Sequence, residues 1–356
     1  MDVAIVGAAG ACGRQVAMQL LDRRVIPSTA RLQLVGHRGG ASEHELWGLR
    51  ADLQDAFADW APRIELVFTP QEVNADIVVM MAGATVSLDP GAPVDRLALG
   101  RLNAEMFTEY AVALAKLPQP PKVVVQSNPV ELGVHIFAQH LPPERVLGAA
   151  GWSDTLRFRH ELAVEFGVPR PRVSAMVLGQ HGDYLVPLWS SVQIQGMSQE
   201  EVTAGIEQIR RGRRLADLPE EVTAERAFML ALIRQHRIQD AYERVRALPA
   251  DQRVAVKPFF TAFTSGRTTE VVTAHAALDI VAAIVDGTAM SFPAQVLSQG
   301  GWNKLSAPVA TPVFLGTHGW NHDLEVSLAE DELVALASAD AAVAAAIGAV
   351  LTPAER

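Results

Sequence analysis

The stretch VAIVGAAGACG, residues 3–13, decides the fold of the N-terminal half of the chain. Residues 3–6 are apolar and partly β-branched, which indicates a buried strand. Three glycines follow, and the apolar residues from Arg14 to Arg24 then recur at helical spacing. Glycine permits a tight turn and lets the backbone approach a pyrophosphate, which sits on the N-terminus of the next helix. This order predicts a dinucleotide site whose turn is formed by Gly7, Gly10, Ala11, Cys12 and Gly13.

The second expected strand, residues 31–35, is followed by Gly36, His37 and Arg38. An NAD enzyme usually ends this strand with an acidic residue that binds the ribose 2′-hydroxyl group. Without that carboxylate a 2′-phosphate is not repelled, and the planar guanidinium of Arg38 can bind it. A polar loop without a ligand is the other interpretation of GHRGG. Because the acid is missing, the sequence favours NADP, with NAD as the alternative.

Strands and helices continue to alternate along the N-terminal half. Strands are expected over residues 64–68, 75–81 and 122–126, and helices over residues 44–57 and 96–116. This alternation predicts an α/β fold with a parallel, doubly wound sheet, which binds ligands at the carboxyl ends of its strands. Gly83, Ser127 and Asn128 fall at such ends and are therefore candidate cofactor contacts.

Composition narrows the class of protein. The chain has 356 residues and a net charge of −10, which argues against a nucleic-acid partner because phosphate binding needs a basic surface. A single cysteine excludes an internal disulfide and a multi-cysteine zinc site, and it suits a reducing cytoplasm. No metal is expected. The N-terminus has no basic leader, and we expect no membrane span; residues 335–350 are interpreted as a packed helix.

A second informative stretch, MVLGQHGDYLVPLWSS, covers residues 176–191. Gly179 and Gly182 flank His181 at the end of an expected strand. A histidine held in this way can act as a general acid/base near neutral pH. For this motif alone, a histidine in a glycine-rich turn without a function is the alternative.

Seven stretches in order resemble the lactate/malate dehydrogenase family, and the resemblance runs from residue 1 to about residue 330. They are GAAGACG (7–13), MAGA (81–84), DRLALGRLN (95–103), QSNPVE (126–131), GWSDTLRFRHELA (151–163), GQHGDYLVPLWS (179–190) and TPVFLGTHG (311–319). The GHRGG segment and LWGLRADLQDAF are similar to the NADP-dependent malate enzymes of chloroplasts.

The resemblance implies a Rossmann domain over residues 1–149 and an α+β catalytic domain over residues 150–356. It also implies hydride transfer between NADP(H), or NAD(H), and a 2-oxo/2-hydroxy carboxylic acid. Family members are dimers or tetramers, so a homodimer or homotetramer is expected.

The resemblance assigns roles to individual residues. His181 corresponds to the proton donor/acceptor, Asp154 to its paired carboxylate, and Arg157 to the clamp on the substrate carboxylate. Further family positions correspond to a carbonyl-polarising arginine (Arg96), a substrate-binding amide (Asn128), a residue facing the cofactor near the nicotinamide (Asn103) and a pocket-lining threonine (Thr268).

The chain also departs from the family pattern. The loop between Ala84 and Arg96 is longer than expected and has no arginine before Arg96, where malate enzymes bind the second carboxylate; the specificity position falls near Ser87 or Leu88. Residues 205–260 form an insertion rich in Arg and Glu, expected as one or two solvated helices.

Three alternatives remain open. Arg267 could restore dicarboxylate binding and make the protein a malate dehydrogenase proper. A catalytically idle nucleotide-binding homologue is the second alternative. The third is an NAD-dependent glycosidase, which needs a Cys and a His for metal, and Cys12 is in the wrong place for that.

Overall fold

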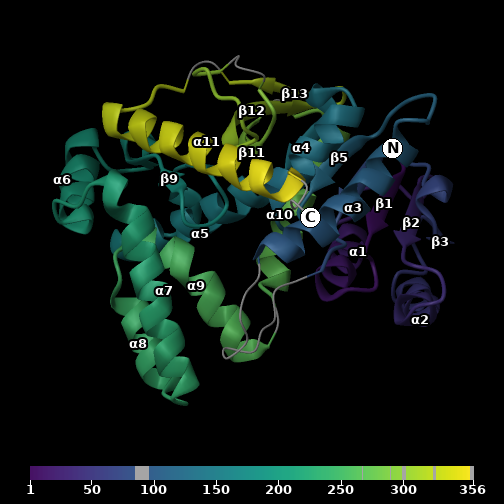
Figure 1. Ribbon diagram of the computed structural model, residues 1–356, viewed down its shortest axis with the longest axis horizontal. Helices are drawn as coiled ribbons and strands as arrows, with labels where there is room; N and C mark the ends of the chain where they lie inside the picture. The colour runs from purple at the N-terminus through teal and green to yellow at the C-terminus, as the bar shows by residue number, and fades with distance from the viewer. Residues whose placement is uncertain (85–95, 267, 289, 299–301, 324–325, 353–356) are drawn as a thin grey trace.

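The N-terminal half alternates strands and helices as expected. The computed structural model describes residues 1–84, 96–266, 268–288, 290–298, 302–323 and 326–352 (Figure 1). In chain order the first elements are β1 (Val3–Val6), α1 (Ala11–Asp22), β2 (Arg31–Val35), α2 (Ala41–Ala56), β3 (Arg63–Val67), β4 (Ile77–Met80), α3 (Arg96–Leu114), β5 (Lys122–Val125), α4 (Val130–His140) and β6 (Val146–Gly148).

These six strands form a parallel sheet in the order β3-β2-β1-β4-β5-β6. Val3 is in register with Leu32 on one side and with Ile77 on the other. The chain order therefore reverses between β1 and β4, which is where doubly wound sheets bind their ligands. The predicted Rossmann sheet is confirmed.

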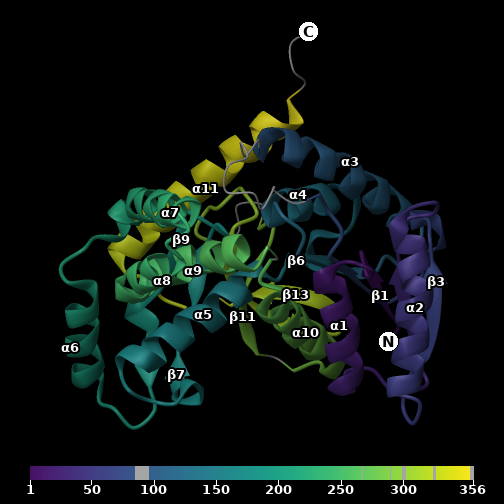
Figure 2. The same cartoon turned by 90° about the horizontal axis from the view of Figure 1, so that it is seen from below.

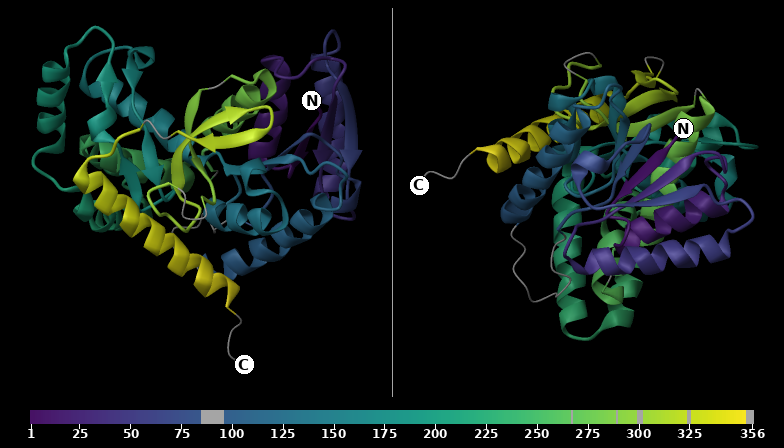
Figure 3. Two further views of the ribbon diagram at one scale, coloured as in Figure 1. Left: turned by 90° about the horizontal axis from the view of Figure 1, so that it is seen from above. Right: turned by 90° about the vertical axis from the view of Figure 1, so that its right-hand side faces the viewer.

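Both faces of this sheet are buried, because successive strand residues point to opposite sides. Val3 and Ile5 pack with the apolar residues of α1, α2 and the later helix α10 (Glu270–Asp286). Ala4 and Val6 belong to a second cluster with α3, α4 and the C-terminal helix α11 (Glu330–Leu351). Figure 3 shows α1 and α2 side by side beneath the strands. The central strands β1 and β4 therefore read as continuous apolar runs, whereas β2 and β3 toward the edge also contain Gln33 and Glu65.

The C-terminal half mixes antiparallel strands with helices. Its elements before α10 are α5 (Ala150–Glu165), β7 (Val173–Ser174), β8 (Val177–Gly179), β9 (Leu185–Pro187), β10 (Gln193–Ile194), α6 (Gln199–Arg210), α7 (Leu218–Arg234), α8 (Ile238–Ala247) and α9 (Ala250–Ser265). After α10 come β11 (Ser291–Gln295), β12 (Ala310–Gly316), β13 (Gly319–His322) and α11.

One sheet continues through both halves of the chain. Strand β11 is antiparallel to β6, with Gln295 opposite Gly148, and β12, β8 and β9 extend the sheet in antiparallel fashion. A parallel Rossmann sheet followed by an α+β part is therefore observed. The domain boundary at residues 149/150 stays a prediction, and it falls just after the last parallel strand.

The segment 205–260 differs from the expected one or two solvated helices. It contains the end of α6, all of α7 and α8 and most of α9, and Figures 1 and 2 show α7, α8 and α9 packed together. Val222, Met229 and Ile233 on α7 are buried in a third apolar cluster that includes residues of α5. Many of its charges also pair within the segment: Arg213 binds both Glu221 and Asp251. The segment is a packed part of the fold.

Helix α11 begins five residues before the expected helix over residues 335–350, at Glu330. Within the described residues it is the one helix with the length and composition to cross a membrane, with a mean hydropathy of 2.0 over a window that is 22% buried. Its inner face, with Leu336, Ala339 and Val343, packs into the core. The helix lies beside α3 near its C-terminal end (Figures 2 and 3).

Candidate active site

The glycine turn after β1 has no room for a side chain at Gly7 or Gly13. Gly7 has a φ of +83°, and a Cβ atom there would lie 2.7 Å from the backbone of Ala82. A Cβ atom on Gly13 would lie 2.2 Å from the carbonyl oxygen of Gly7. Gly10 is the N-cap residue of α1, so no side chain caps this helix. The turn and the uncapped helix fit a pyrophosphate group.

Cys12 lies in this turn as a half-buried free thiol. Its Sγ atom is 3.3 Å from the hydroxyl oxygen of Thr268, at a distance where either group can donate the hydrogen bond. Burial raises the pKa of the Cys12 thiol, which therefore stays uncharged at neutral pH. The contact joins the turn to the segment before α10.

The loop after β2 presents Arg38 to solvent. The Arg38 side chain is 62% exposed, 4.0 Å from the Glu72 carboxylate and 5.5 Å from the centre of the Phe68 ring. The backbone N–H of His37 donates to the hydroxyl of Ser42, which fixes the start of the loop. A Cβ atom on Gly36 would lie 2.6 Å from Cδ1 of Leu46, a fully buried side chain. The exposed guanidinium can meet an anion in competition with Glu72, whereas position 36 favours glycine.

Asn103 holds the ends of two strands together. Its side-chain amide donates to the carbonyl groups of Ala84 (3.0 Å) and Asn128 (2.7 Å), and its oxygen accepts from the N–H of Ala84 (2.8 Å). It is 1% exposed. Gly83 lies against the same amide, since a Cβ atom there would be 3.3 Å from the Asn103 oxygen. The Asn103 side chain was expected to face the cofactor. In the structure its amide instead binds the backbone of Ala84 and Asn128.

At the end of β5, two neighbouring polar residues differ in exposure. The Ser127 hydroxyl is buried and donates to the carbonyl of Met80, at the end of β4. Asn128 is exposed. Of the two, Asn128 is the one whose side chain can reach a ligand.

The strongest cluster joins His181 to α5. Nδ1 of His181 lies 2.7 Å from Oδ2 of Asp154, whose side chain is 5% exposed. Burial alone lowers the pKa of His181, but the charge and hydrogen bond of Asp154 raise it, and the result is a pKa above the usual 6.5. No hydrogen bond to Nε2 is found among the described residues. The imidazole thus has one nitrogen fixed and one available for proton transfer.

The same carboxylate also orients Arg157. Nη1 of Arg157 donates to Oδ1 of Asp154 at 2.8 Å, and Nη2 donates to the hydroxyl of Thr269 at 3.0 Å. Asp154 and Arg157 are three residues apart on α5, so they share a helix face. The predicted pocket threonine was Thr268, but its hydroxyl contacts Cys12. Thr269 is the threonine beside the guanidinium.

Glu131, on α4, is a further member of the cluster that sequence reasoning missed. Its Oε1 atom accepts a hydrogen bond of 2.7 Å from the backbone N–H of His181. Glu131 is 6% exposed, and burial raises the pKa of its carboxyl group. Its charge also raises the pKa of His181. The sequence does contain a feature that points to Glu131: it is an acidic residue in the otherwise apolar start of a helix, VELGV.

Several predicted positions lie outside the described residues. These are the side chain of Arg96, residue Arg267 and the loop 85–95, with Ser87 and Leu88. Arg96 is the first residue of α3. Across the described ranges, no group of three or more His, Cys, Asp or Glu residues could hold a metal ion.

Comparisons with known proteins agree with this arrangement. Residues 1–148 match the family described as "lactate/malate dehydrogenase, NAD binding domain". The chain is 30% identical to the malate dehydrogenase of Methanothermobacter marburgensis over 206 residues, which are 56% of this chain and 60% of the relative. It is 30% identical over 204 residues, or 55% of this chain and 62% of the relative, to the L-2-hydroxycarboxylate dehydrogenase (NAD(P)(+)) of Methanocaldococcus jannaschii.

The fold similarity covers a larger part of the chain. The crystal structure of malate dehydrogenase from Plasmodium falciparum superposes with a TM-score of 0.74 over 98% of both chains, at 19% identity. At that identity the superposition establishes the fold. The chain thus spans about three fifths of the length of these two curated relatives, and nearly the whole length of the Plasmodium falciparum structure.

Proposed function

We propose that the chain is an enzyme of the lactate/malate dehydrogenase type, which transfers a hydride between a nicotinamide cofactor and a 2-oxo/2-hydroxy carboxylic acid; the match of residues 1–148 to the NAD binding domain of that family supports the proposal. The observation that carries the proposal is the Asp154 carboxylate, which binds His181 through one oxygen and Arg157 through the other. This places a proton donor beside a cation that suits a carboxylate ligand.

Each group has a distinct task in the reduction of a 2-oxo acid. A bound nicotinamide cofactor supplies the hydride that reaches the carbonyl carbon. His181 gives the proton on Nε2 to the carbonyl oxygen, and the Asp154 carboxylate stabilises the imidazolium before that transfer. Arg157 binds the substrate carboxylate through its planar guanidinium, with Thr269 orienting it. Oxidation of the 2-hydroxy acid is the reverse.

Two further groups would act on the substrate by their family positions. Asn128 would donate a hydrogen bond to it, and Arg96 would polarise the reacting carbonyl.

We propose NADP(H) as the cofactor, with NAD(H) as the alternative. The glycine turn fits the pyrophosphate, since Gly7 and Gly13 allow its tight backbone packing and Gly10 leaves the N-terminus of α1 without a side-chain cap. Arg38 is exposed at the end of β2 and can bind a 2′-phosphate. Glu72, 4.0 Å from Arg38, is the opposing consideration, because its carboxylate competes for the same guanidinium.

The test is a panel of 2-oxo acids, with oxaloacetate included, assayed with NADPH and with NADH. His181→Asn serves as the control for turnover at this site. Turnover of a 2-oxo acid that this variant loses supports the proposal. An absence of turnover across the panel, with cofactor still bound, favours the idle nucleotide-binding homologue instead.

The assembly and the compartment are also proposals. By its family we propose a homodimer or homotetramer, which sedimentation at several protein concentrations tests. The single cysteine suits the cytoplasm, which cell fractionation tests.

A further inference from the structure

We infer that Arg226, on helix α7, is a positioning residue for the turn that carries His181. The inference rests on the proposed role of His181 as the acid/base. Arg226 binds the carboxylate of Asp183 with both terminal nitrogens: Nη1 contacts Oδ1, and Nη2 lies 3.1 Å from Oδ2. Asp183 follows His181 by two residues, so helix α7 holds one end of the acid/base turn.

The Arg226–Asp183 pair is largely removed from solvent. The side chain of Arg226 is 15% exposed and that of Asp183 is 19% exposed. The guanidinium carbon lies 4.9 Å from the centre of the Phe259 ring, on α9. Because a buried charge without a partner is very costly, the two side chains constrain each other's position. Their two parallel hydrogen bonds also fix direction, which a single contact would not do.

Arg226 lies on the inner face of α7. Val222, four residues earlier, and Met229, three residues later, are both fully buried. Residues at this spacing share one face of a helix, so Arg226 interrupts an apolar stripe. A charged residue in such a stripe needs a specific partner, and Asp183 is that partner. The pair therefore orients α7 and the turn relative to each other.

The turn needs this support because two of its residues are glycines with left-handed backbone. Gly179 has a φ of +82° and Gly182 a φ of +147°, conformations that glycine adopts freely. Glu131 holds the His181 backbone, and Asp154 holds its ring. Beyond Gly182, the Gln180 N–H donates to the carbonyl of Tyr184 and fixes the backbone after Asp183, while the ion pair to Arg226 fixes the Asp183 side chain.

Helix α7 is connected through α9 to α5, the helix that carries Asp154. Glu221 on α7 accepts a hydrogen bond of 2.8 Å from Gln252 on α9. Arg253 on α9 in turn binds Glu161 on α5 at 2.6 Å. Since α5 also carries Asp154 and Arg157, Arg226 can hold the turn in a fixed place relative to both.

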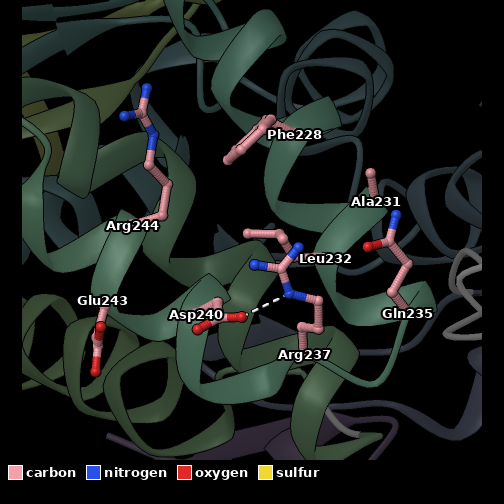
Figure 4. A pocket seen from close by; sticks show the side chains of 8 residues that line it. All are labelled: Phe228, Ala231, Leu232, Gln235, Arg237, Asp240, Glu243 and Arg244. Carbon is pink, nitrogen blue, oxygen red and sulfur yellow. Dashed lines mark hydrogen bonds and ion pairs between the residues drawn. The ribbon is translucent and has the colours of Figure 1, made fainter.

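The experiment compares Arg226→Met with a matched control, Arg244→Met. Arg244, on α8, also binds a carboxylate through two nitrogens, that of Glu225, and its guanidinium carbon lies 5.4 Å from the Phe228 ring centre. Figure 4 shows Arg244 and Phe228 at a hollow of about 320 Å³ formed by α7, α8 and their connecting turn. The control removes a two-nitrogen arginine–carboxylate pair that joins α8 to α7, at a more exposed position than Arg226, without touching the turn.

Arg226→Met is expected to lower kcat on the order of ten- to a hundredfold, the effect of a misplaced catalytic group, with the KM for cofactor unchanged. Arg244→Met is expected to retain the parental kcat. Arg226→Lys keeps the charge but loses the paired geometry, and it is expected to fall between Arg226→Met and the parent. If Arg226→Met does not fold, Arg226→Lys decides. A parental kcat in the folded Arg226 variant overturns the inference.

A second variant separates positioning from charge. In Arg226→Met with Asp183→Asn, neither partner is charged, so the cost of an isolated carboxylate is removed. If the pair positions the turn, the double variant keeps the lowered kcat. Recovery of the parental kcat would show that the unpaired Asp183 charge caused the defect, and the inference would then be wrong.

An NMR readout tests the inference without turnover. The ring signal of His181 is identified by its loss in His181→Asn, and its chemical shift is followed in the parent and in both arginine variants. A shifted signal in Arg226→Met and an unshifted one in Arg244→Met support the inference. An unshifted signal in both overturns it. A parent protein that is inactive with every 2-oxo acid would contradict the proposed function, and the NMR comparison would still decide the role of Arg226.

Discussion

The imidazole Nδ1 of His181 lies 2.7 Å from Oδ2 of Asp154, while the other oxygen of that carboxylate accepts a hydrogen bond from Arg157. One buried carboxylate thus orients both the proposed proton donor and the proposed substrate clamp. A change at Asp154 should therefore alter both proton transfer and substrate affinity. A change at His181 should alter proton transfer alone.

His181→Asn is expected to bind cofactor normally and to lose turnover on the order of a thousandfold, the contribution of a positioned acid/base. Steady-state kinetics with the best 2-oxo acid measure the loss, and cofactor titration provides the control. Activity close to that of the parent would remove His181 from the mechanism.

Asp154→Asn is expected to shift the pH profile of 2-oxo acid reduction to lower pH. Reduction needs protonated His181, so its rate falls as the pH rises through the pKa of that group. The Asp154 carboxylate raises that pKa, and the amide of Asn has no charge to do so. The alkaline limb of kcat against pH is the measurement. An unshifted limb would contradict the pairing.

Glu131→Gln separates the two contributions of Glu131. The amide oxygen can still accept the hydrogen bond from the His181 backbone, but the charge that raises the pKa of His181 is gone. The alkaline limb should again move to lower pH, by less than in Asp154→Asn, whereas Glu131→Ala should also lower kcat by releasing the backbone. Equal kinetics in the Gln and Ala variants would leave Glu131 without a positioning role.

Glu131→Gln is also expected to change how the stability of the protein depends on pH. Burial raises the pKa of Glu131 above its usual 4.5, so the folded state keeps a proton that the unfolded state releases. The free energy of unfolding therefore decreases as the pH rises from about 4.5 through the raised pKa. Glu131→Gln should lack this decrease, which urea denaturation at several pH values would show.

The sequence predicted best what is determined locally. The approach of Gly13 to the Gly7 carbonyl lies within the glycine turn itself, and the parallel sheet follows from the alternation of strands and helices. His181, Asp154 and Arg157 were identified by family resemblance, and the structure brings them into contact. No periodicity connects residues 154 and 181, so local pattern alone could not have paired them.

The sequence predicted least well where a contact spans many residues or depends on register. Glu131 meets His181 across fifty positions, and Thr268 and Thr269 differ by one residue and by the side of the chain to which they turn. The charges of residues 205–260 indicated solvated helices because the sequence does not show that many of them pair, some within the segment and others, such as Arg226 with Asp183, outside it. Pairs such as Arg213–Asp251 allow such helices to pack.

Arg38→Ser is expected to reduce the preference for NADPH over NADH. A charge-assisted hydrogen bond contributes about 1.5–3 kcal/mol, so the ratio of kcat/KM values should fall by roughly tenfold or more. Gly36→Asp is the less suitable variant, because its Cβ atom would displace the buried Leu46. Arg63→Ser provides a control at an exposed arginine that is paired with Glu65 on β3. A parent protein that already prefers NADH would make the interpretation of GHRGG wrong.

Oxaloacetate is expected to be a poor substrate compared with a 2-oxo acid that has an apolar or larger side chain. Arg157 provides one carboxylate clamp, and a second carboxylate needs a second buried cation because an unpaired buried charge is very costly. The loop where malate enzymes carry that cation has Thr85, Val86, Ser87 and Leu88, and then an acid, Asp89. Arg267 is the residue that could supply the cation instead, so the assay includes Arg267→Ala. Efficient oxaloacetate reduction by the parent would contradict the prediction, and its loss in Arg267→Ala would identify Arg267 as the second clamp.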